Sequence, residues 1–117
     1  MINGIGSSLS GLLALQKKNE SIANNTANVN TDGFKKTRVT LQEGAEGTVT
    51  TNIETVSTPG PMVYEQTTEG QTLVEQSNVD LAEEIPQQLM NKRFYQANLK
   101  TIQTQDEMLG SLLDIKS

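Results

Sequence analysis

Side chains that could bind a cation are concentrated between Asn24 and Lys36, in the stretch NNTANVNTDGFKK. Four asparagines and an Asp-Gly pair occur there, and amide and carboxylate oxygens are ligands that calcium accepts. The calcium loop of an EF-hand begins with the pattern D-x-[DN]-x-[DN]-G. Its first half is matched by four residues: Asn28, Asn30, Asp32 and Gly33. The stretch is therefore either a cation site or a turn that uses the same residue types.

The second half of the calcium template is absent. Counted from Asn28, the bidentate acid at the twelfth position would fall on Val39, which cannot ligate a cation. Lys35 and Lys36 precede that position and would repel the ion. We therefore predict a metal-free loop that acts as a turn, in which asparagines satisfy the orphan carbonyls of a helix end and Gly33 adopts a positive φ.

Histidine and cysteine are both absent from the 117 residues. Imidazole bases, thiol nucleophiles, the usual zinc ligands and every Ser-His-Asp arrangement are excluded as a result. A pair of carboxylates could hydrolyse a glycan, but the acidic residues here are scattered over expected strands and turns. We predict a protein that is not an enzyme, with no catalytic residue, no cofactor and no metal.

A first helix should precede the asparagine-rich turn, and together they make up residues 1–31. Its apolar residues follow the alternating three-and-four spacing of one helix face. This stripe contains Ile5, Leu9, Leu12, Leu15 and Ile22. Ser8 and Asn19 interrupt it, as expected for a helix that is stable only when it packs against other helices. The asparagines that follow bond their own backbone, so the helix should end near them.

A small β region is predicted for residues 32–77. The stretch TVTTNIETVST is rich in β-branched residues, and MVYEQ and TLVEQS flank the turn-like pair Glu69-Gly70. The PGP sequence at 59–61 separates these runs. A hairpin or meander fits, and three or more strands or a packed helix are needed to stabilise it.

A second long helix should occupy residues 78–117. Its apolar stripe contains Leu81, Ile85, Tyr95, Leu99, Ile102, Leu109 and Leu113. A further stripe near its end contains Phe94, Met108, Leu112 and Ile115, so the helix can contact two neighbours at once. Asp80 and Glu83 can form a capping box, whereas Pro86 should kink the helix or delay its regular part.

Charge is distributed unevenly along the chain, whose net charge is −5. The first 40 residues are basic, and no lysine or arginine occurs between Val39 and Asn91, where the acids lie. The simpler interpretation is a solvated acidic surface, and the alternative is a basic arm that meets the acidic middle of a neighbouring copy. Nucleic acid is a poor candidate partner. No apolar run approaches the roughly 20 residues that cross a bilayer, so we predict no membrane insertion.

Both ends of the chain resemble motifs of the bacterial flagellar rod and hook axial proteins. The stretch IANNTANVNTDGFKKTRV is similar to their N-terminal motif, Ala-Asn-Asn-x-Ala-Asn-x-Asn-Thr-x-Gly-Phe, with Thr26 where many members have leucine. The stretch LVEQSNVDLAEEIPQQLMNKRFYQANLKTIQTQDEMLGSLLDI resembles their C-terminal motif, in which Ser-Asn-Val-Asp-Leu leads into a helix with a Tyr-Gln-Ala-Asn core. Together the two motifs cover more than half of the chain.

This resemblance implies an α+β subunit whose N-terminal and C-terminal helices pair as a coiled coil, with the small β hairpin or meander between them. It implies that seven residues hold the inter-helix turn: Asn24, Asn25, Asn28, Asn30, Thr31, Gly33 and Phe34. The second helix would start at 78–81 and carry its packing core at 95–98. The apolar stripe from Ile5 to Ile22 and the one from Leu81 to Leu113 would then form the assembly surface.

The function implied by the resemblance is that of a structural subunit of the flagellar basal-body rod. Such a subunit is exported by the flagellar type III apparatus without a cleaved signal, and self-assembles with its own copies and other axial proteins into a periplasmic tube. The alternative is an adaptor or export-associated protein that docks on the axial structure without polymerising. In length the chain resembles proximal-rod subunits, and in its C-terminal motif the distal-rod and hook group.

Overall fold

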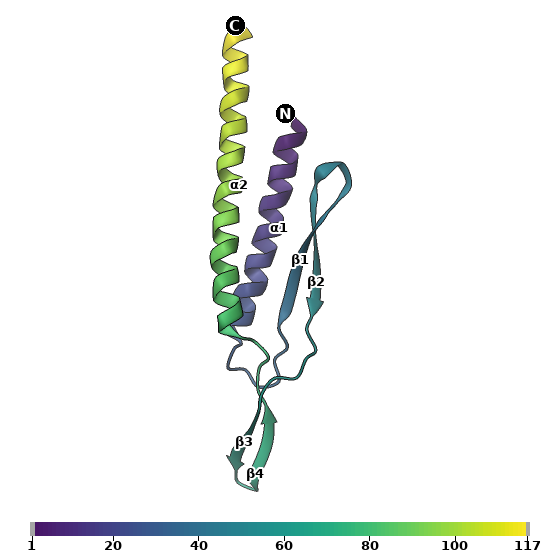
Figure 1. Cartoon of the computed structure of the whole chain (residues 1–117), viewed down its shortest axis with the longest axis vertical. Helices are drawn as coiled ribbons and strands as arrows, with labels where there is room; N and C mark the ends of the chain where they lie inside the picture. The colour runs from purple at the N-terminus through teal and green to yellow at the C-terminus, as the bar shows by residue number, and fades with distance from the viewer. Residues whose placement is uncertain (1, 117) are drawn as a thin grey trace.

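Two long antiparallel helices and two β-hairpins make up the computed structural model, which describes residues 2–116 (Figure 1). Helix α1 spans Ile2–Ala27 and helix α2 spans Leu81–Lys116. The strands between them are β1 (Thr37–Glu43), β2 (Val49–Thr55), β3 (Met62–Thr67) and β4 (Gly70–Glu75). The α+β class expected from the sequence is confirmed, with both long helices and a small β region between them.

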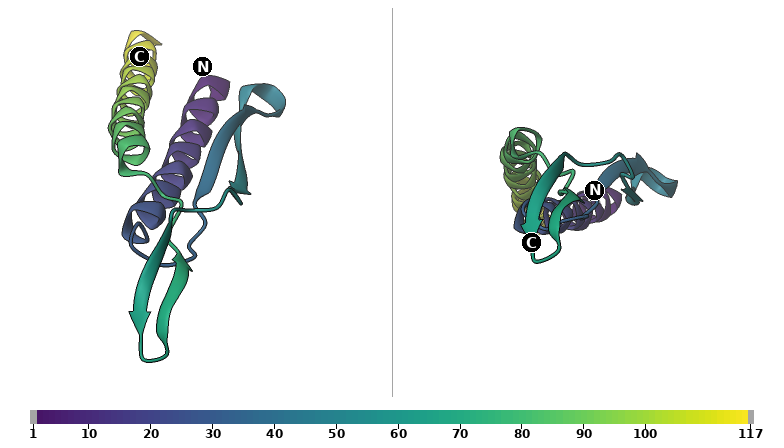
Figure 2. Two further views of the ribbon diagram at one scale, coloured as in Figure 1. Left: turned by 60° about the horizontal axis from the view of Figure 1, so that its bottom comes forward. Right: turned by 90° about the horizontal axis from the view of Figure 1, so that it is seen from below.

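The molecule is elongated, with principal extents of 81 × 24 × 18 Å. Helix α1 lies between α2 and the β1–β2 hairpin and contacts both (Figures 1 and 2). The β3–β4 hairpin projects from the opposite end of the molecule to the two termini (Figure 1). None of the described helices carries an apolar window long enough to cross a bilayer.

The β region consists of two separate two-stranded antiparallel sheets. In the first, Val39 faces Ile53, and a short 3-10 turn at Ala45–Gly47 joins the strands. In the second, Tyr64 faces Leu73, and the turn falls where the Glu69-Gly70 pair predicts it. The run of β-branched residues predicted as a strand forms β2, and it pairs with β1. No strand was predicted at β1.

The hydrophobic core is small and is centred on one face of α1. Its buried apolar residues are Leu12, Ala14, Leu15, Ile22, Val39 and Val79. Every residue of β3 is exposed, so this hairpin contributes little to the core. It is held at its base instead, where Gly33 N donates to Glu75 O at 2.9 Å. The bond from Gln76 N to Pro61 O, at 2.8 Å, extends the β3–β4 ladder by one pair.

The start of α2 differs from expectation in two respects. The helix is regular from Leu81 and runs without interruption across Pro86, so the predicted delay is wrong. Asp80 Oδ1 caps the helix by accepting a hydrogen bond from Ala82 N at 3.0 Å. The reciprocal half of the capping box is missing because the Glu83 carboxylate instead binds Lys36 and Arg38.

Candidate functional site: the polar junction and the helix seam

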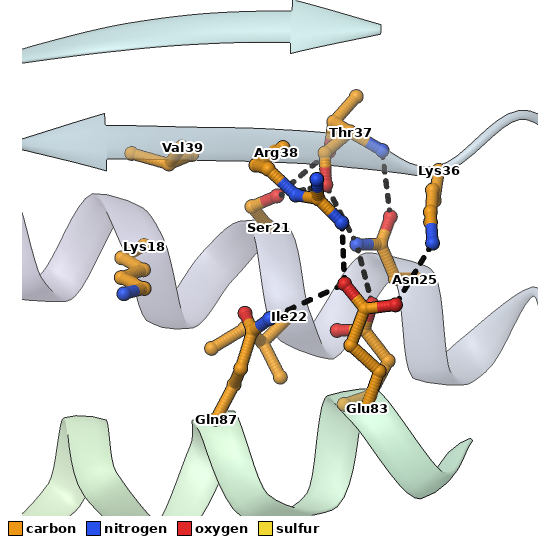
Figure 3. A pocket seen from close by; sticks show the side chains of 11 residues that line it. Lys18, Ser21, Ile22, Asn25, Lys36, Thr37, Arg38, Val39, Glu83 and Gln87 are labelled. Carbon is orange, nitrogen blue, oxygen red and sulfur yellow. Dashed lines mark hydrogen bonds and ion pairs between the residues drawn. The ribbon is translucent and has the colours of Figure 1, made fainter. Parts of the chain in front are cut away.

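Two adjacent carboxylates with shifted pKa values, Glu83 and Glu84, lie where the end of α1, the start of β1 and the start of α2 come together, here called the polar junction (Figure 3). Glu83 receives Lys36 Nζ at 3.0 Å on one oxygen and Arg38 Nη2 on the other. The hydrogen bond from Lys36 is the main cause of a lowered pKa of Glu83. Its neighbour Glu84 points into the protein and is only 3% exposed.

Asn25 joins the buried carboxylate to the strand. Its Oδ1 accepts from Thr37 N at 3.0 Å, and its Nδ2 donates to Thr37 O at 2.8 Å and to Glu84 Oε1 at 3.4 Å. Burial raises the pKa of Glu84, and the Asn25 hydrogen bond offsets part of that rise. The other oxygen, Oε2, has no partner among the described residues.

Two adjacent carboxylates with opposite pKa shifts are a pattern that acid–base enzymes use. Here the enclosed space beside Glu83 and Glu84 is only about 10 Å³. That volume admits about one water molecule and no substrate. Among the described residues, no three acidic side chains gather where they could hold a metal ion. The hydrogen bonds and ion pairs of the polar junction connect three elements, but the junction has no room for a substrate.

A second asparagine braces the loops below the junction. Asn78 Nδ2 donates to Val56 O at 2.8 Å and to Thr58 O at 2.9 Å, while its Oδ1 accepts from Lys36 N at 2.7 Å. Asn78 N also donates to Phe34 O at 3.2 Å. This residue, expected at the start of the second helix, therefore connects both hairpins to the chain that follows α1.

The asparagine-rich turn is built largely from its own hydrogen bonds. Asn28 Nδ2 donates to Asn24 O at 2.8 Å, and Thr31 Oγ1 donates to Asn28 Oδ1 at 3.0 Å. Gly33 has φ +71°, which confirms its predicted positive φ. Asn30 is exposed, and Phe34 is half-buried. Of the seven residues assigned to the turn, Asn25 alone is buried, because it points away toward the polar junction.

The contact between α1 and α2, here called the helix seam, combines an apolar face of α1 with polar residues of α2. Asn91 Nδ2 donates to Leu15 O at 3.0 Å, and Asn98 Nδ2 donates to Ser8 O at 2.9 Å. These bonds are one heptad apart on both helices. A Cβ added at Gly11 would lie 2.6 Å from Asn98 Nδ2, so glycine permits this close approach.

The polar side of the seam was missed by sequence reasoning, which followed apolar residues only. Its signal is a heptad of polar residues on α2: Glu84, Asn91, Asn98 and Gln105. A matching heptad on α1 places Gly4 against Gln105 and Gly11 against Asn98. Looking for polar residues and glycines at the same seven-residue spacing would have revealed it.

The structure brings together only part of the two stripes that were expected to meet. Leu12, Leu15 and Ile22 are buried, and Ile5 is half-buried, whereas Leu9 is 52% exposed. On α2, Tyr95 and Ile102 are half-buried. The remaining stripe residues are exposed: Leu81, Ile85, Leu99, Leu109 and Leu113. Much of the apolar surface of α2 is therefore uncovered within one chain.

The basic residues after α1 find their partners within the chain. Lys35 pairs with Glu75 at the base of the β3–β4 hairpin, and Lys36 and Arg38 pair with Glu83. The Lys35 hydrogen bond is the main cause of a lowered pKa of Glu75. These three cations therefore stabilise the fold of the single chain. Their positive charge is neutralised within the chain by Glu75 and Glu83.

Fold and site together define an elongated structural protein, in which terminal helices pair through a polar seam and asparagines join two hairpins to them. Residues 5–35 match the family model for the flagella basal body rod protein. Residues 71–115 match the model for the C-terminal region of the flagellar basal body rod FlgEFG proteins. The chain belongs to the family of flagellar basal-body rod and hook proteins.

Individual relatives match over less than half of the chain. The flagellar basal-body rod protein FlgG of Bacillus subtilis is 45% identical over 49 residues, which are 42% of this chain and 19% of that protein. The flagellar hook protein FlgE of Escherichia coli is 42% identical over 43 residues, or 37% of this chain and 11% of that protein. The chain thus spans less than a fifth of the length of these relatives.

Proposed function

We propose that this chain is a structural subunit of the flagellar basal-body rod and that it self-assembles through its terminal helices. The observation that carries this function is the uncovered apolar surface of α2. Its most exposed members include Ile85, Leu89, Met90, Phe94 and Leu113, each more than half exposed. Burying such a side chain contributes roughly 1.5 to 3 kcal/mol, so packing between copies would stabilise an assembly.

The partners are other copies of the chain and other rod and hook axial proteins, and the location is the periplasmic rod. The family models at both ends support this assignment, since they describe basal-body rod proteins. The net charge of −5 does not favour nucleic acid as a partner. The role we propose is non-enzymatic, in keeping with the lack of substrate space at the polar junction.

Leu99→Asp tests this function. Leu99 is 45% exposed, so the monomer should stay folded while a carboxylate disrupts the contact between copies. We expect loss of tubes in electron micrographs of the concentrated protein and loss of motility in a strain that depends on the variant. Glu46→Lys is the control, because a single exposed charge usually changes stability by no more than about 0.5 kcal/mol.

Leu12→Asp answers a different question, because Leu12 is buried against the rest of its own chain. We expect that variant to unfold the helix pair as well as to prevent assembly. Should Leu99→Asp still form tubes and restore motility as well as Glu46→Lys does, α2 is not the assembly surface. Discrete small oligomers that bind flagellar axial protein without polymerising would support the adaptor instead.

A further inference from the structure

A groove of about 450 Å³ lies where β1, α1 and α2 face one another. Three of its lining side chains are large, apolar and substantially exposed: Leu41 at 40%, Met90 at 56% and Phe94 at 53%. Lys18 and Arg38 add positive charge to the lining. Arg38 is paired with Glu83, whereas Lys18 makes no ion pair with any residue in the described part of the chain.

The far end of α2 has complementary chemistry. Gly4 lies against Gln105, so the helix after this point extends past the start of α1 (Figure 1). We call residues 106–115 the C-terminal overhang. Met108, Leu112 and Ile115 line one surface of it together with Glu107, and they are 53%, 51% and 81% exposed. Asp106 adds a second negative charge.

We propose that the groove receives the C-terminal overhang of a second copy of this chain. Met108, Leu112 and Ile115 would pack on Leu41, Met90 and Phe94, and Glu107 would face Lys18. Both faces are apolar and the charges are opposite in sign, which favours this contact over like-charge alternatives. Docking of this kind rests on the proposed function, since it names the contact through which copies would assemble.

The overhang cannot fill the groove of its own chain. Phe94 and Met108 lie on one continuous helix, about 21 Å apart along its axis at about 1.5 Å per residue. Each copy therefore donates one surface and accepts on a different one, which is a heterologous contact that propagates unless it closes into a ring.

Two copies whose α2 helices point in the same direction would be offset along the helix axis by about 30 Å. This is the helix rise between residue 92, beside the groove, and residue 112, in the overhang. This offset is well below the 81 Å length of the molecule. Successive copies would therefore overlap along their sides and would not simply touch end to end.

The absence of cysteine allows a direct test by disulfide cross-linking. Phe94→Cys protein and size-tagged Leu112→Cys protein are mixed, assembled and oxidised, so that only contact between two copies can give the heterodimer. We expect this heterodimer to form at least tenfold more than with Ser57→Cys in place of Phe94→Cys, because Ser57 is exposed in the loop outside the groove.

Charge reversal gives a second measurement. Lys18→Glu should raise the concentration needed for half-assembly roughly fivefold, as loss of one partly exposed ion pair predicts, and Glu107→Lys in the same chain should restore it. Lys17→Glu is the matched control, since Lys17 is the adjacent exposed lysine and does not line the groove.

The outcomes separate the two proposals. If the parent chain assembles but the pair Phe94→Cys and Leu112→Cys gives no more heterodimer than the Ser57→Cys control, the docking alone is overturned. A link from Phe94→Cys to a different flagellar protein in basal bodies, in place of one to a second copy, also overturns it. If the parent chain does not assemble at millimolar concentration and the cysteine variants do not cross-link, the proposed function is overturned as well.

Discussion

The side-chain amide of Asn25 satisfies both backbone polar groups of Thr37, accepting from its N–H at 3.0 Å and donating to its C=O at 2.8 Å. Thr37 is paired with Thr55 of β2, so an asparagine on α1 takes the place of a strand on the other edge of β1. The same amide also reaches Glu84 Oε1, so one side chain connects β1, α1 and α2 (Figure 3).

Asn25→Ala should lower the free energy of unfolding by about 2 to 3 kcal/mol, because it leaves the half-buried backbone groups of Thr37 and the buried Glu84 carboxylate without this partner. Urea unfolding followed by circular dichroism measures the change. Asn30→Ala is the control, since Asn30 is exposed in the turn that follows. Equal losses for the two variants would contradict a special role for Asn25.

Glu84→Gln should stabilise the protein at neutral pH by about 1 kcal/mol, because it removes a buried charge while keeping an acceptor for Asn25. Burial raises the pKa of Glu84, so the folded state holds this proton more tightly than the unfolded state. The Glu84 contribution to stability is therefore fully present below the unfolded pKa and is lost as pH rises through the folded pKa. Urea midpoints between pH 4 and 8 should show the advantage of Glu84→Gln growing with pH.

Glu83→Gln should show the opposite dependence of stability on pH in the same urea experiment. Lys36 holds the pKa of Glu83 below its ordinary value, so its stabilising contribution is present at neutral pH and is lost as pH falls through the folded pKa. The variant should be less stable than the parent at pH 7, and the two should converge in acid. The same pH trend for both variants would rule out the opposed environments of the two carboxylates.

Gly6→Ala and Gly11→Ala should differ by at least about 1 kcal/mol, although both exchange a glycine of α1 for a better helix former. Nothing lies within 4 Å of a Cβ at Gly6, so this variant should be stabilised by about 1 kcal/mol. At Gly11 the new Cβ would displace Asn98 Nδ2 from Ser8 O. Thermal unfolding measures both changes.

Asn98→Ala is the background that isolates this effect, because it removes the amide that the new Cβ would meet. In that background Gly11→Ala should show the full helix-propensity gain, and the difference between the two backgrounds is the coupling energy of the pair. A coupling energy near zero would show that Gly11 is not required for the close approach.

Glu46→Gly should stabilise the β1–β2 hairpin by about 1 kcal/mol, because Glu46 has φ 59° and ψ 31°, a left-handed conformation that costs a residue with a Cβ roughly that amount. Ala45→Gly is the matched control in the same turn. Ala45 has no positive φ, so glycine there should destabilise through the entropy of the unfolded chain. Urea unfolding of both variants checks the sign, and a loss of stability in Glu46→Gly would contradict the strain.

Local sequence patterns predicted those elements whose signals lie within one segment. The spacing of apolar residues indicated both helices, and Glu69-Gly70 between two β-branched runs indicated β3 and β4. The β1–β2 hairpin was not resolved, because its turn sequence, EGAEGT, includes a glutamate in a conformation usually reserved for glycine or asparagine.

The site depends on contacts that the spacing of apolar residues does not encode. Asn91 and Asn98 bond backbone carbonyls of α1, so their role exists only once small residues let the helices approach. Likewise, Lys36 and Glu83 are both visible in the sequence, but their pairing follows from the way α1, β1 and α2 converge. Apolar periodicity instead suggested that the two stripes would cover each other, and much of the α2 stripe is exposed.

The heptad spacing of the Asn91 and Asn98 hydrogen bonds has a mechanical consequence. If the two helices slid past each other by one residue, each amide would move off its carbonyl, and the next equivalent register lies a full heptad away, about 10.5 Å of helix rise. Small shear displacements therefore break both hydrogen bonds at once, and no intermediate register of the two helices restores them. Under tension or torque, α1 and α2 behave as one stiff strut, and compliance is left to the slender β3–β4 projection.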